Sequence, residues 1–244
     1  MTRWLRVRVA VDRALAVGLG VVAGPVVAGL AVVIRRHDGG PPLVRLIRVG
    51  QGGQRFEMWK LRTMHVGGPG GRAGGPPIAS YHDDRVTPIG RRIRRWRLDE
   101  LPQLYNVVRG EMALLGPRPE TPEYVDLGDE SWQRVLRGRP GIAGPTQLAV
   151  HEMESVAIAS DGGEELYRDV ILPAKLAIDA WYVEQASPFI DLLVIVGLVE
   201  RFLLRRQALV LDGVVSRHAL DLGAVRERVD ARAGCEPGAS DGPT

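Results

Sequence analysis

The sequence contains a single cysteine, Cys235, in a chain of 244 residues. One thiol cannot form an internal disulfide or a cysteine zinc site, so a disulfide-rich secreted fold is excluded. So few cysteines are typical of a reducing, cytosolic setting for the soluble part of the protein. A chain of this length can bury an ordinary core, and it corresponds to one domain or to one domain with appendages.

Lysine is also scarce: Lys60 and Lys175 are the two lysines among 32 basic residues, and the others are arginine. The formal net charge is only +3. A GC-rich genome can explain a general excess of arginine, but it does not explain clusters of it. Because the planar guanidinium suits bidentate contacts with phosphate, the clusters indicate where an anionic ligand would bind.

One long stretch lacks charge altogether. Residues 14–34 are uncharged, and a bilayer-spanning helix needs roughly 20 such residues. Arginines flank both ends, and basic flanks prefer the cytoplasmic side. Gly24 and Pro25 lie in the middle, where proline removes a helix hydrogen bond. We expect residues 1–36 to form a re-entrant membrane helix that breaks at Gly24 and Pro25 and returns to the same face. The alternative is a spanning helix with a proline kink.

Residues 41–65 contain two apolar stretches around a glycine-rich turn at positions 50–53, which predicts a small β-hairpin. Lys60 and Arg62 are two residues apart, so on a strand they project from the same face. Two cations on one face could meet one phosphate, although a solvated strand face is the commoner explanation.

A loop rich in glycine and proline follows at residues 66–77, and we assign it no chemistry. The cluster of His82, Asp83 and Asp84 comes next. These side chains could bind a metal, but no second cluster at ligand spacing accompanies them, so a helix or turn cap is favoured.

From Ile89 the pattern is helical, with Ile89, Ile93 and Trp96 on one face. The remaining faces are basic, through Arg91, Arg92, Arg94, Arg95 and Arg97. Such a helix suits nucleic acid, a membrane surface or an anionic substrate. Because no nucleic-acid motif accompanies it, we expect no nucleic-acid partner.

Residues 98–110 predict a helix with Asp99 as its N-cap and Gly110 as its stop signal. Asp99 and Glu100 would then lie at the positive end of the helix dipole. Capping alone is the ordinary explanation for such a pair. The upstream arginines, and Arg118 in a rigid Gly-Pro-Arg-Pro turn, favour a site for phosphate chemistry instead.

The order of these motifs resembles the monotopic phosphoglycosyl transferases, bacterial sugar transferases that move a phosphosugar from a nucleotide diphosphosugar to polyprenol phosphate. The likeness covers roughly residues 12–206. The motifs that carry it are Asp12-Arg13 before the apolar segment, Lys60-Leu-Arg62-Thr-Met64, Asp84-Arg85-Val-Thr87 with Gly90 and Arg94, Leu98-Asp99-Glu100-Leu-Pro-Gln103 with Asn106 and Gly110, Gly116-Pro-Arg-Pro119, Arg139-Pro-Gly-Ile142, Asp179-Ala-Trp-Tyr182 and Ser187 to Asp191.

The resemblance implies that Asp99 is the nucleophile and that Glu100 completes an acidic dyad beside a bound Mg²⁺ ion. Asp99 would attack the sugar-bearing phosphate of a UDP-sugar, UMP would leave, and polyprenol phosphate (undecaprenyl phosphate) would accept the phosphosugar. Arg94 and Arg118 would bind substrate phosphate, with Lys60 as a further candidate. A covalent intermediate predicts ping-pong kinetics.

Two positions depart from the family pattern. Arg97 stands where relatives usually have a small hydroxyl residue, and Pro145 stands where they tend to have tryptophan. Both are expected to shape the nucleotide end of the pocket, where they would bear on the choice of donor.

We therefore expect an α+β, predominantly helical fold: a membrane-associated re-entrant helix at 1–36, one globular cytosolic catalytic domain at 37–206, and a variable, partly disordered tail at 207–244. The implied location is the bacterial inner membrane, with the active site on the cytoplasmic face. The partners would be a UDP-sugar, polyprenol phosphate and membrane lipid, with a homo-oligomer left open. The alternative function is a non-catalytic, membrane-anchored protein that binds anionic lipid or polyprenol phosphate, or helps a glycan assembly complex to form.

Overall fold

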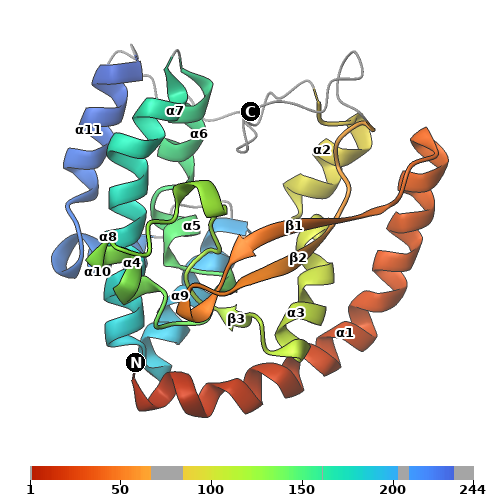
Figure 1. The fold of residues 1–244 in the computed structure, drawn as a ribbon, viewed down its shortest axis with the longest axis horizontal. Helices are drawn as coiled ribbons and strands as arrows, with labels where there is room; N and C mark the ends of the chain where they lie inside the picture. Colours follow the sequence, from red (N-terminus) through yellow and green to blue (C-terminus); the bar gives the residue numbers. More distant parts are fainter. Residues whose placement is uncertain (1, 67–84, 161, 203–208, 234–244) are drawn as a thin grey trace.

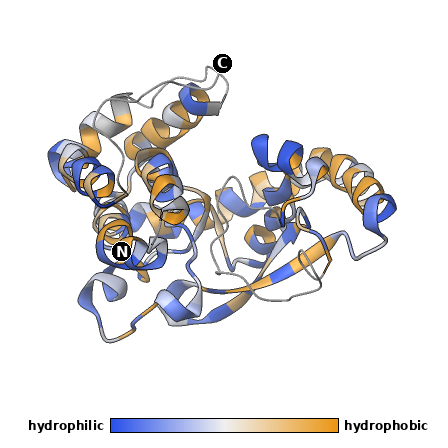
Figure 2. Cartoon of the chain, turned by 90° about the horizontal axis from the view of Figure 1, so that it is seen from above, coloured by the Kyte–Doolittle hydropathy of each residue, from blue (hydrophilic) through white to orange (hydrophobic). Residues whose placement is uncertain are grey.

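A computed structural model of the chain describes residues 2–66, 85–160, 162–202 and 209–233 (Figure 1). Helices dominate, and the described strands form one antiparallel pair and one short parallel pair. The expected helical α+β class is confirmed. In Figure 2 the described chain forms two groups of helices, and the amino terminus lies with one of them. The predictions at residues 67–84, including His82, Asp83 and Asp84, lie outside the described residues.

Helix α1 spans Arg3–Asp38, begins where Thr2 accepts the N–H of Leu5, and ends at Gly39 with a φ of 74°. It is one continuous helix through Gly24 and Pro25, so the expected interruption is wrong. Figure 1 shows a curved helix that changes direction along its length, which fits a proline that removes one hydrogen bond without ending the helix. Whether the helix re-enters or spans a bilayer stays a prediction.

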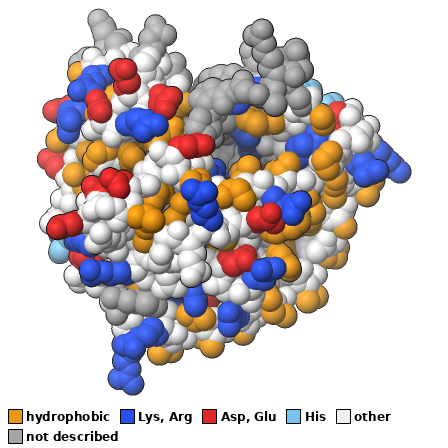
Figure 3. All heavy atoms as spheres, in the orientation of Figure 1, with side chains coloured by type: hydrophobic (Ala, Val, Ile, Leu, Met, Phe, Trp, Pro, Cys, Tyr) orange, Lys and Arg blue, Asp and Glu red, His pale blue; other side chains and the backbone are white. Residues whose placement is uncertain are grey.

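The middle of α1 is exposed and apolar. Val21 and Val22 are 73% and 74% exposed, and hydrophobic side chains line the lower right edge of the face in Figure 3, where α1 lies. By length and composition, α1 is the one described helix that could cross a membrane. An exposed apolar surface of this extent is unfavourable in water and indicates contact with lipid or protein.

The first turns of α1 are buried in the domain. Arg8 donates hydrogen bonds to Asp191 at 2.6 Å and to Tyr182 at 2.8 Å, and Trp4 donates to Asp191 at 2.8 Å. These contacts join the start of the chain to the carboxyl-terminal helices. Residues 1–36 are therefore not a separate unit: their first part belongs to the globular domain and the exposed part follows.

Strands β1 (Leu43–Val49) and β2 (Arg55–Leu61) form the expected antiparallel hairpin, joined by the short helix η1 (Gln51–Gly53). Arg48 pairs with Phe56 and Val44 pairs with Lys60. Because directly opposed residues share a face and the side chains alternate along each strand, Arg48 and Lys60 project from the same face of the hairpin.

Helix α2 (Pro88–Arg95) is capped by Thr87, whose hydroxyl accepts the Gly90 N–H at 2.8 Å. Ile93 is buried as expected, but Trp96 is 60% exposed and leaves the predicted apolar face. The helical pattern fails there because α2 ends at Arg95.

The chain then forms the 3₁₀ helix η3 (Leu98–Gln103) and helix α3 (Leu104–Arg109) in place of one helix from 98. Arg97, with a φ of 51°, is the residue before η3, so the prediction that Asp99 is the N-cap is wrong. Gly110 ends α3 with a φ of 79°, as expected.

The remaining elements complete the core. They are β3 (Ala113–Leu115), η4 (Pro122–Tyr124), α4 (Glu130–Val135), β4 (Gly141–Ala143), α5 (Pro145–Ala149), α6 (His151–Ala159), α7 (Gly163–Leu166), the π-helical turn η5 (Tyr167–Ile171), α8 (Leu172–Gln185), α9 (Pro188–Phe202), α10 (Leu209–His218) and α11 (Leu222–Ala233). Strand β3 pairs in parallel with β4. The largest cluster of buried apolar side chains surrounds α8, whose Ile178 and Tyr182 are fully buried.

Part of the predicted variable, partly disordered tail at 207–244 is helical: α10 and α11 cover most of residues 209–233. Helices α10 and α11 place Leu211, Val215 and Val229, all fully buried, in the main core. Residues 234–244 lie outside the described part of the chain. The core therefore continues past the domain boundary that we expected at residue 206.

Candidate active site

Asp99 and Glu100 lie on η3, two and three residues after Arg97, which has a positive φ. Their side chains are 10% and 7% exposed. A charged carboxylate with so little solvent needs a compensating charge or hydrogen bonds. The two carboxylates therefore need nearby cations, and three different segments of the chain supply them.

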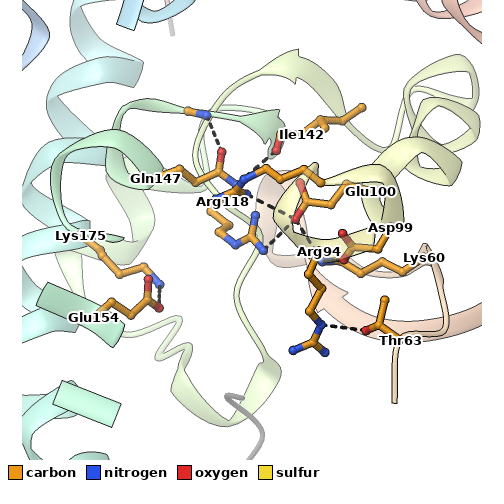
Figure 4. A network of polar contacts seen from close by, with 12 residues as sticks. Lys60, Thr63, Arg94, Asp99, Glu100, Arg118, Ile142, Gln147, Glu154 and Lys175 are labelled. Carbon is orange, nitrogen blue, oxygen red and sulfur yellow. Dashed lines mark hydrogen bonds and ion pairs between the residues drawn. The ribbon is translucent and has the colours of Figure 1, made fainter. Parts of the chain in front are cut away.

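Glu100 is the carboxylate that the cations hold. Its Oε1 atom lies 3.1 Å from Lys60 Nζ on β2, 3.1 Å from Arg118 Nη2 and 3.5 Å from Arg97 Nη1 (Figure 4). Burial alone would raise the pKa of Glu100, but the charges of Lys60, Arg118 and Arg97 outweigh it and hold the pKa well below its usual range. Glu100 is therefore ionised at any physiological pH.

Asp99 is bound much less tightly. Lys60 Nζ is 3.5 Å from its Oδ2 atom, and within the described residues no hydrogen bond reaches its carboxylate. Since a nucleophile must leave its lone pairs free to attack, Asp99 is the member of the pair that is suited to that role. The contrast between the two neighbours is the main feature of the site's geometry.

Arg94 approaches from α2, on the Asp99 side of the pair. Its Nε atom donates to Thr63 Oγ1 at 2.7 Å (Figure 4). Arg62, which could have met the same phosphate as Lys60, lies elsewhere. It binds both carboxylate oxygens of Asp38 at the end of α1. Lys60 and Arg62 therefore do not meet at one anion, because β2 ends at Leu61 and the side-chain alternation stops there.

Arg118 is placed by the turn between β3 and η4. The Gly116 N–H donates to Ala143 O at 2.8 Å, and the Gly141 N–H donates to Pro117 O at 2.8 Å. A Cβ atom on Gly141 would lie 2.1 Å from the Gly116 nitrogen, so only glycine permits this approach. The turn that holds Arg118 is thus fixed by backbone pairing.

A second, largely buried set of polar side chains lies behind Arg118, and the sequence did not reveal it. This buried network consists of Glu120, Glu154, Tyr167 and Lys175. Lys175 Nζ donates to Glu120 at 2.9 Å, to Tyr167 at 2.8 Å and to Glu154 at 3.3 Å, which uses all three of its hydrogens. Burial alone would raise the pKa of Glu120, but Lys175 and the hydrogen bonds lower it to about 2.

Two signals pointed to this network. Glu120 directly follows the Gly-Pro-Arg-Pro motif, and Lys175 is one of two lysines in an arginine-rich chain. Of the two departures from the family pattern, Arg97 joins the site through Glu100, and Pro145 is buried at the start of α5. Neither residue displaces the acidic pair.

Asp99 and Glu100 are the residues of the site that could hold a metal ion. No group of three or more His, Cys, Asp or Glu residues at ligand spacing occurs in the described residues, so an all-protein cage is not formed there. Mg²⁺, however, is usually held by one or two carboxylates together with substrate phosphates and water. Asp99 and Glu100 fit that mode, because Glu100 Oε2 and Asp99 Oδ1 have no ion-pair partner among the described residues.

Comparison with known proteins supplies the family. The model of the bacterial sugar transferase family matches residues 3–205. A UDP-glucose:undecaprenyl-phosphate glucose-1-phosphate transferase from Caulobacter vibrioides is 34% identical over 204 residues, which are 82% of this chain and 70% of the relative. The exopolysaccharide production protein ExoY from Sinorhizobium fredii is 31% identical over 175 residues, 67% of this chain and 70% of the relative.

A third relative is longer. The UDP-N-acetylgalactosamine-undecaprenyl-phosphate N-acetylgalactosaminephosphotransferase of Aeromonas hydrophila is 33% identical over 176 residues, which are 70% of this chain but only 37% of that protein. This chain belongs to the bacterial sugar transferase family and is an enzyme of the phosphoglycosyl transferase class.

Proposed function

We propose that this enzyme transfers a phosphosugar from a UDP-sugar to a polyprenol phosphate such as undecaprenyl phosphate. The products would be a polyprenyl-diphospho-sugar and UMP, as the first step of lipid-linked glycan or exopolysaccharide synthesis. The relatives' names support this reaction, since two of them act on undecaprenyl phosphate and name a UDP-sugar donor, and a third is an exopolysaccharide production protein.

The observation that carries the proposal is the asymmetry of the acidic pair. Glu100 is fixed by Lys60, Arg97 and Arg118, whereas Asp99 has one distant ion-pair contact, 3.5 Å from Lys60. A protein that only bound anions would gain nothing from a carboxylate left free beside its cations. A free carboxylate held next to a phosphate site is what nucleophilic catalysis requires.

In the proposed reaction, an Asp99 oxygen attacks the sugar-bearing phosphorus of the donor. The bond from that phosphorus to the bridging oxygen breaks, and the electron pair leaves with UMP. An oxygen of polyprenol phosphate then attacks the same phosphorus and releases the Asp99 carboxylate unchanged. The work of Arg94, Arg118 and Lys60 is to orient the phosphates and to offset the repulsion between two anions.

Magnesium is part of the proposal. Asp99 and Glu100 would hold the ion together with donor phosphate oxygens, and its charge would stabilise the departing UMP. Lys60 and Arg118 keep Glu100 ionised whether or not an ion is bound, because they hold its pKa low. The protein side of the site is therefore ready to receive a cation at any physiological pH.

We further propose that α1 holds the enzyme on the bacterial inner membrane, with the site on the cytoplasmic face. The exposed apolar surface of α1 supports attachment to lipid. Anchoring beside the bilayer would present the site to the head group of polyprenol phosphate. The possibility of a homo-oligomer stays a prediction.

The test is to purify the full chain in nanodiscs, add Mg²⁺, undecaprenyl phosphate and a panel of UDP-sugars, and measure UMP release. Asp99→Asn should lower the rate by about a thousandfold or more, because the attacking oxygen is lost. Asp230→Asn on α11 makes the same chemical change away from the site and should leave the rate unchanged.

A covalent intermediate gives a second readout. Without acceptor, the wild type should exchange labelled UMP into UDP-sugar, and Asp99→Asn should not. UMP release that survives in Asp99→Asn would contradict the nucleophile assignment. No release with any donor would contradict the proposed reaction itself.

A further inference from the structure

Arg48 is a half-buried arginine near the end of β1. It projects from the same face of the hairpin as Lys60, which reaches the acidic pair. The next residue, Val49, donates its N–H to Glu120 O at 3.0 Å. This backbone bond ties the end of β1 to the segment that carries Arg118. Arg48 therefore belongs to the part of the structure that links Lys60 to Arg118.

The side chain of Arg48 has no partner in the described part of the protein. Its Nε atom is buried without a hydrogen bond, and no ion pair or side-chain hydrogen bond involves it there. Leaving a buried donor of a charged group unsatisfied is costly, by an amount comparable to the worth of a hydrogen bond to a charged group. A protein that keeps such a group needs a reason to do so.

No neighbour meets that need. Burial lowers the pKa of Arg48, Glu120 acts to raise it, and Arg118 acts to lower it further. Glu120 is the carboxylate that acts most strongly on Arg48, but its oxygens already bind Lys175, Tyr167 and the Thr121 N–H. Glu123 also acts to raise the pKa of Arg48, but among the described residues neither acid forms an ion pair or a side-chain hydrogen bond with it. The charge of Arg48 is therefore left over once the internal pairs are made.

We propose that Arg48 is a substrate-binding residue, and that it forms with Arg118 a subsite for a phosphate group on the Glu100 side of the acidic pair. This inference rests on the proposed reaction and adds to it a contact with one of the phosphates that the reaction brings together. An arginine fork pairs with two phosphate oxygens at once, which satisfies the idle donors. The phosphate can belong to the nucleotide or to the polyprenol, since both present the same chemistry.

The experiment compares Arg48→Met and Arg48→Lys with the wild type as full chains in nanodiscs. The matched control is Arg45→Met, which changes an exposed arginine three residues earlier on β1. UMP binding is measured by calorimetry, and KM is measured separately for UDP-sugar and for undecaprenyl phosphate. The melting temperature without ligand is recorded for each protein.

In Arg48→Met we expect roughly a tenfold to hundredfold loss in affinity or KM for one phosphate ligand. Arg48→Lys should recover part of it, because it keeps the charge but not the fork. Weaker UMP binding with a raised KM for UDP-sugar assigns the subsite to the nucleotide, and a raised KM for undecaprenyl phosphate alone assigns it to the lipid. The ligand-free melting temperature of Arg48→Met should equal or exceed that of the wild type, since an unpaired charge is removed.

Two results would overturn the inference. One is an unchanged UMP affinity together with unchanged KM values for both substrates. The other is a melting temperature that falls in Arg48→Met as the affinity falls, which would make Arg48 a structural residue. If the wild type releases no UMP from any donor, the proposed reaction fails, while the dependence of UMP binding on Arg48 still decides this subsite.

Discussion

Two clusters of charged side chains lie on either side of the Arg118 turn, and they are built on different principles. In the buried network, Lys175 donates its three hydrogens to three oxygens, and both carboxylate oxygens of Glu120 accept hydrogen bonds. In the site, Glu100 is held by three cations, but Asp99 and Arg48 keep unused bonding capacity. The first cluster is complete without a ligand, and the second is not.

This difference shows how the protein divides stability from chemistry. Complete pairing is expected to make the buried network rigid, and Glu120, two residues after Arg118, connects this network to the Arg118 turn. Incomplete pairing in the site costs stability, which the surrounding structure must supply, and it leaves groups free for substrate. Changes in the buried network should therefore appear as lost stability, whereas changes in the site should appear as lost binding or turnover.

The largest expected effect on stability comes from Lys175→Met. The substitution keeps most of the side-chain volume but leaves Glu120 and Glu154 without their shared cation. Breaking one side of a buried ion pair costs about 3 to 5 kcal/mol, so the melting temperature should fall by roughly 10 °C. Thermal unfolding of the detergent-solubilised chain measures this fall.

The double variant Lys175→Met with Glu120→Gln is its control. Removing one of the two stranded charges should recover part of the stability, so the two changes should not add. A loss below about 1 kcal/mol in the single variant would mean that water or a rearranged side chain replaces Lys175, and the network would then not be the rigid support described above.

A smaller effect depends on pH and involves Asp179, one turn after Lys175 on α8. Burial raises the pKa of Asp179 to about 7, against the charge of Lys175 and the hydrogen bond from Thr146. Between the ordinary value of 3.8 and about 7, the folded protein binds more protons than the unfolded chain. Stability contributed by Asp179 is therefore lost as the pH rises through this window, at roughly 1.4 kcal/mol per unit.

Asp179→Asn removes this dependence, because the amide does not titrate. From pH 5 to pH 8 the unfolding free energy of the wild type should fall relative to the variant by about 2 to 3 kcal/mol. Urea unfolding of both proteins at the two pH values measures the difference, which cancels other groups such as His151, whose pKa burial lowers to about 4. Parallel pH profiles for the two proteins would show that Asp179 keeps an ordinary pKa.

The sequence predicted those features that depend on local spacing. The alternation in residues 41–65 predicted the hairpin, and the hairpin places Lys60 against Glu100. The motif order predicted Arg118 and the acidic pair in one site, and Arg118 lies 3.1 Å from Glu100. Its binding of substrate phosphate remains a prediction. The catalytic and metal-binding roles of these residues remain predictions, because geometry alone does not test them.

What the sequence did not predict depends on packing between distant segments. Lys175 and Glu120 are 55 residues apart, and nothing in local periodicity pairs them. The positive φ of Arg97 was missed because a non-glycine residue rarely adopts it, and only the placement of η3 requires it. The helices after residue 207 carry a helical spacing in Leu211, Val215, Val225 and Val229, but the glycine-rich end of the chain favoured the prediction of a disordered tail.

The smallest expected effect on stability comes from the ion pair of Arg134 and Glu184, although its geometry is better than that of the buried pair of Lys175 and Glu120. Arg134 donates to both oxygens of Glu184, at 2.6 and 2.8 Å, but the two side chains are 47% and 36% exposed. Arg134→Met should lower stability by less than about 1 kcal/mol, because water solvates whichever charge is left behind and the methionine keeps the apolar stem. Thermal unfolding beside Lys175→Met measures both changes under the same conditions. If the two variants lost similar stability, solvent exposure would not explain the difference between the exposed and the buried ion pair. The difference between the buried network and the site would then need another cause.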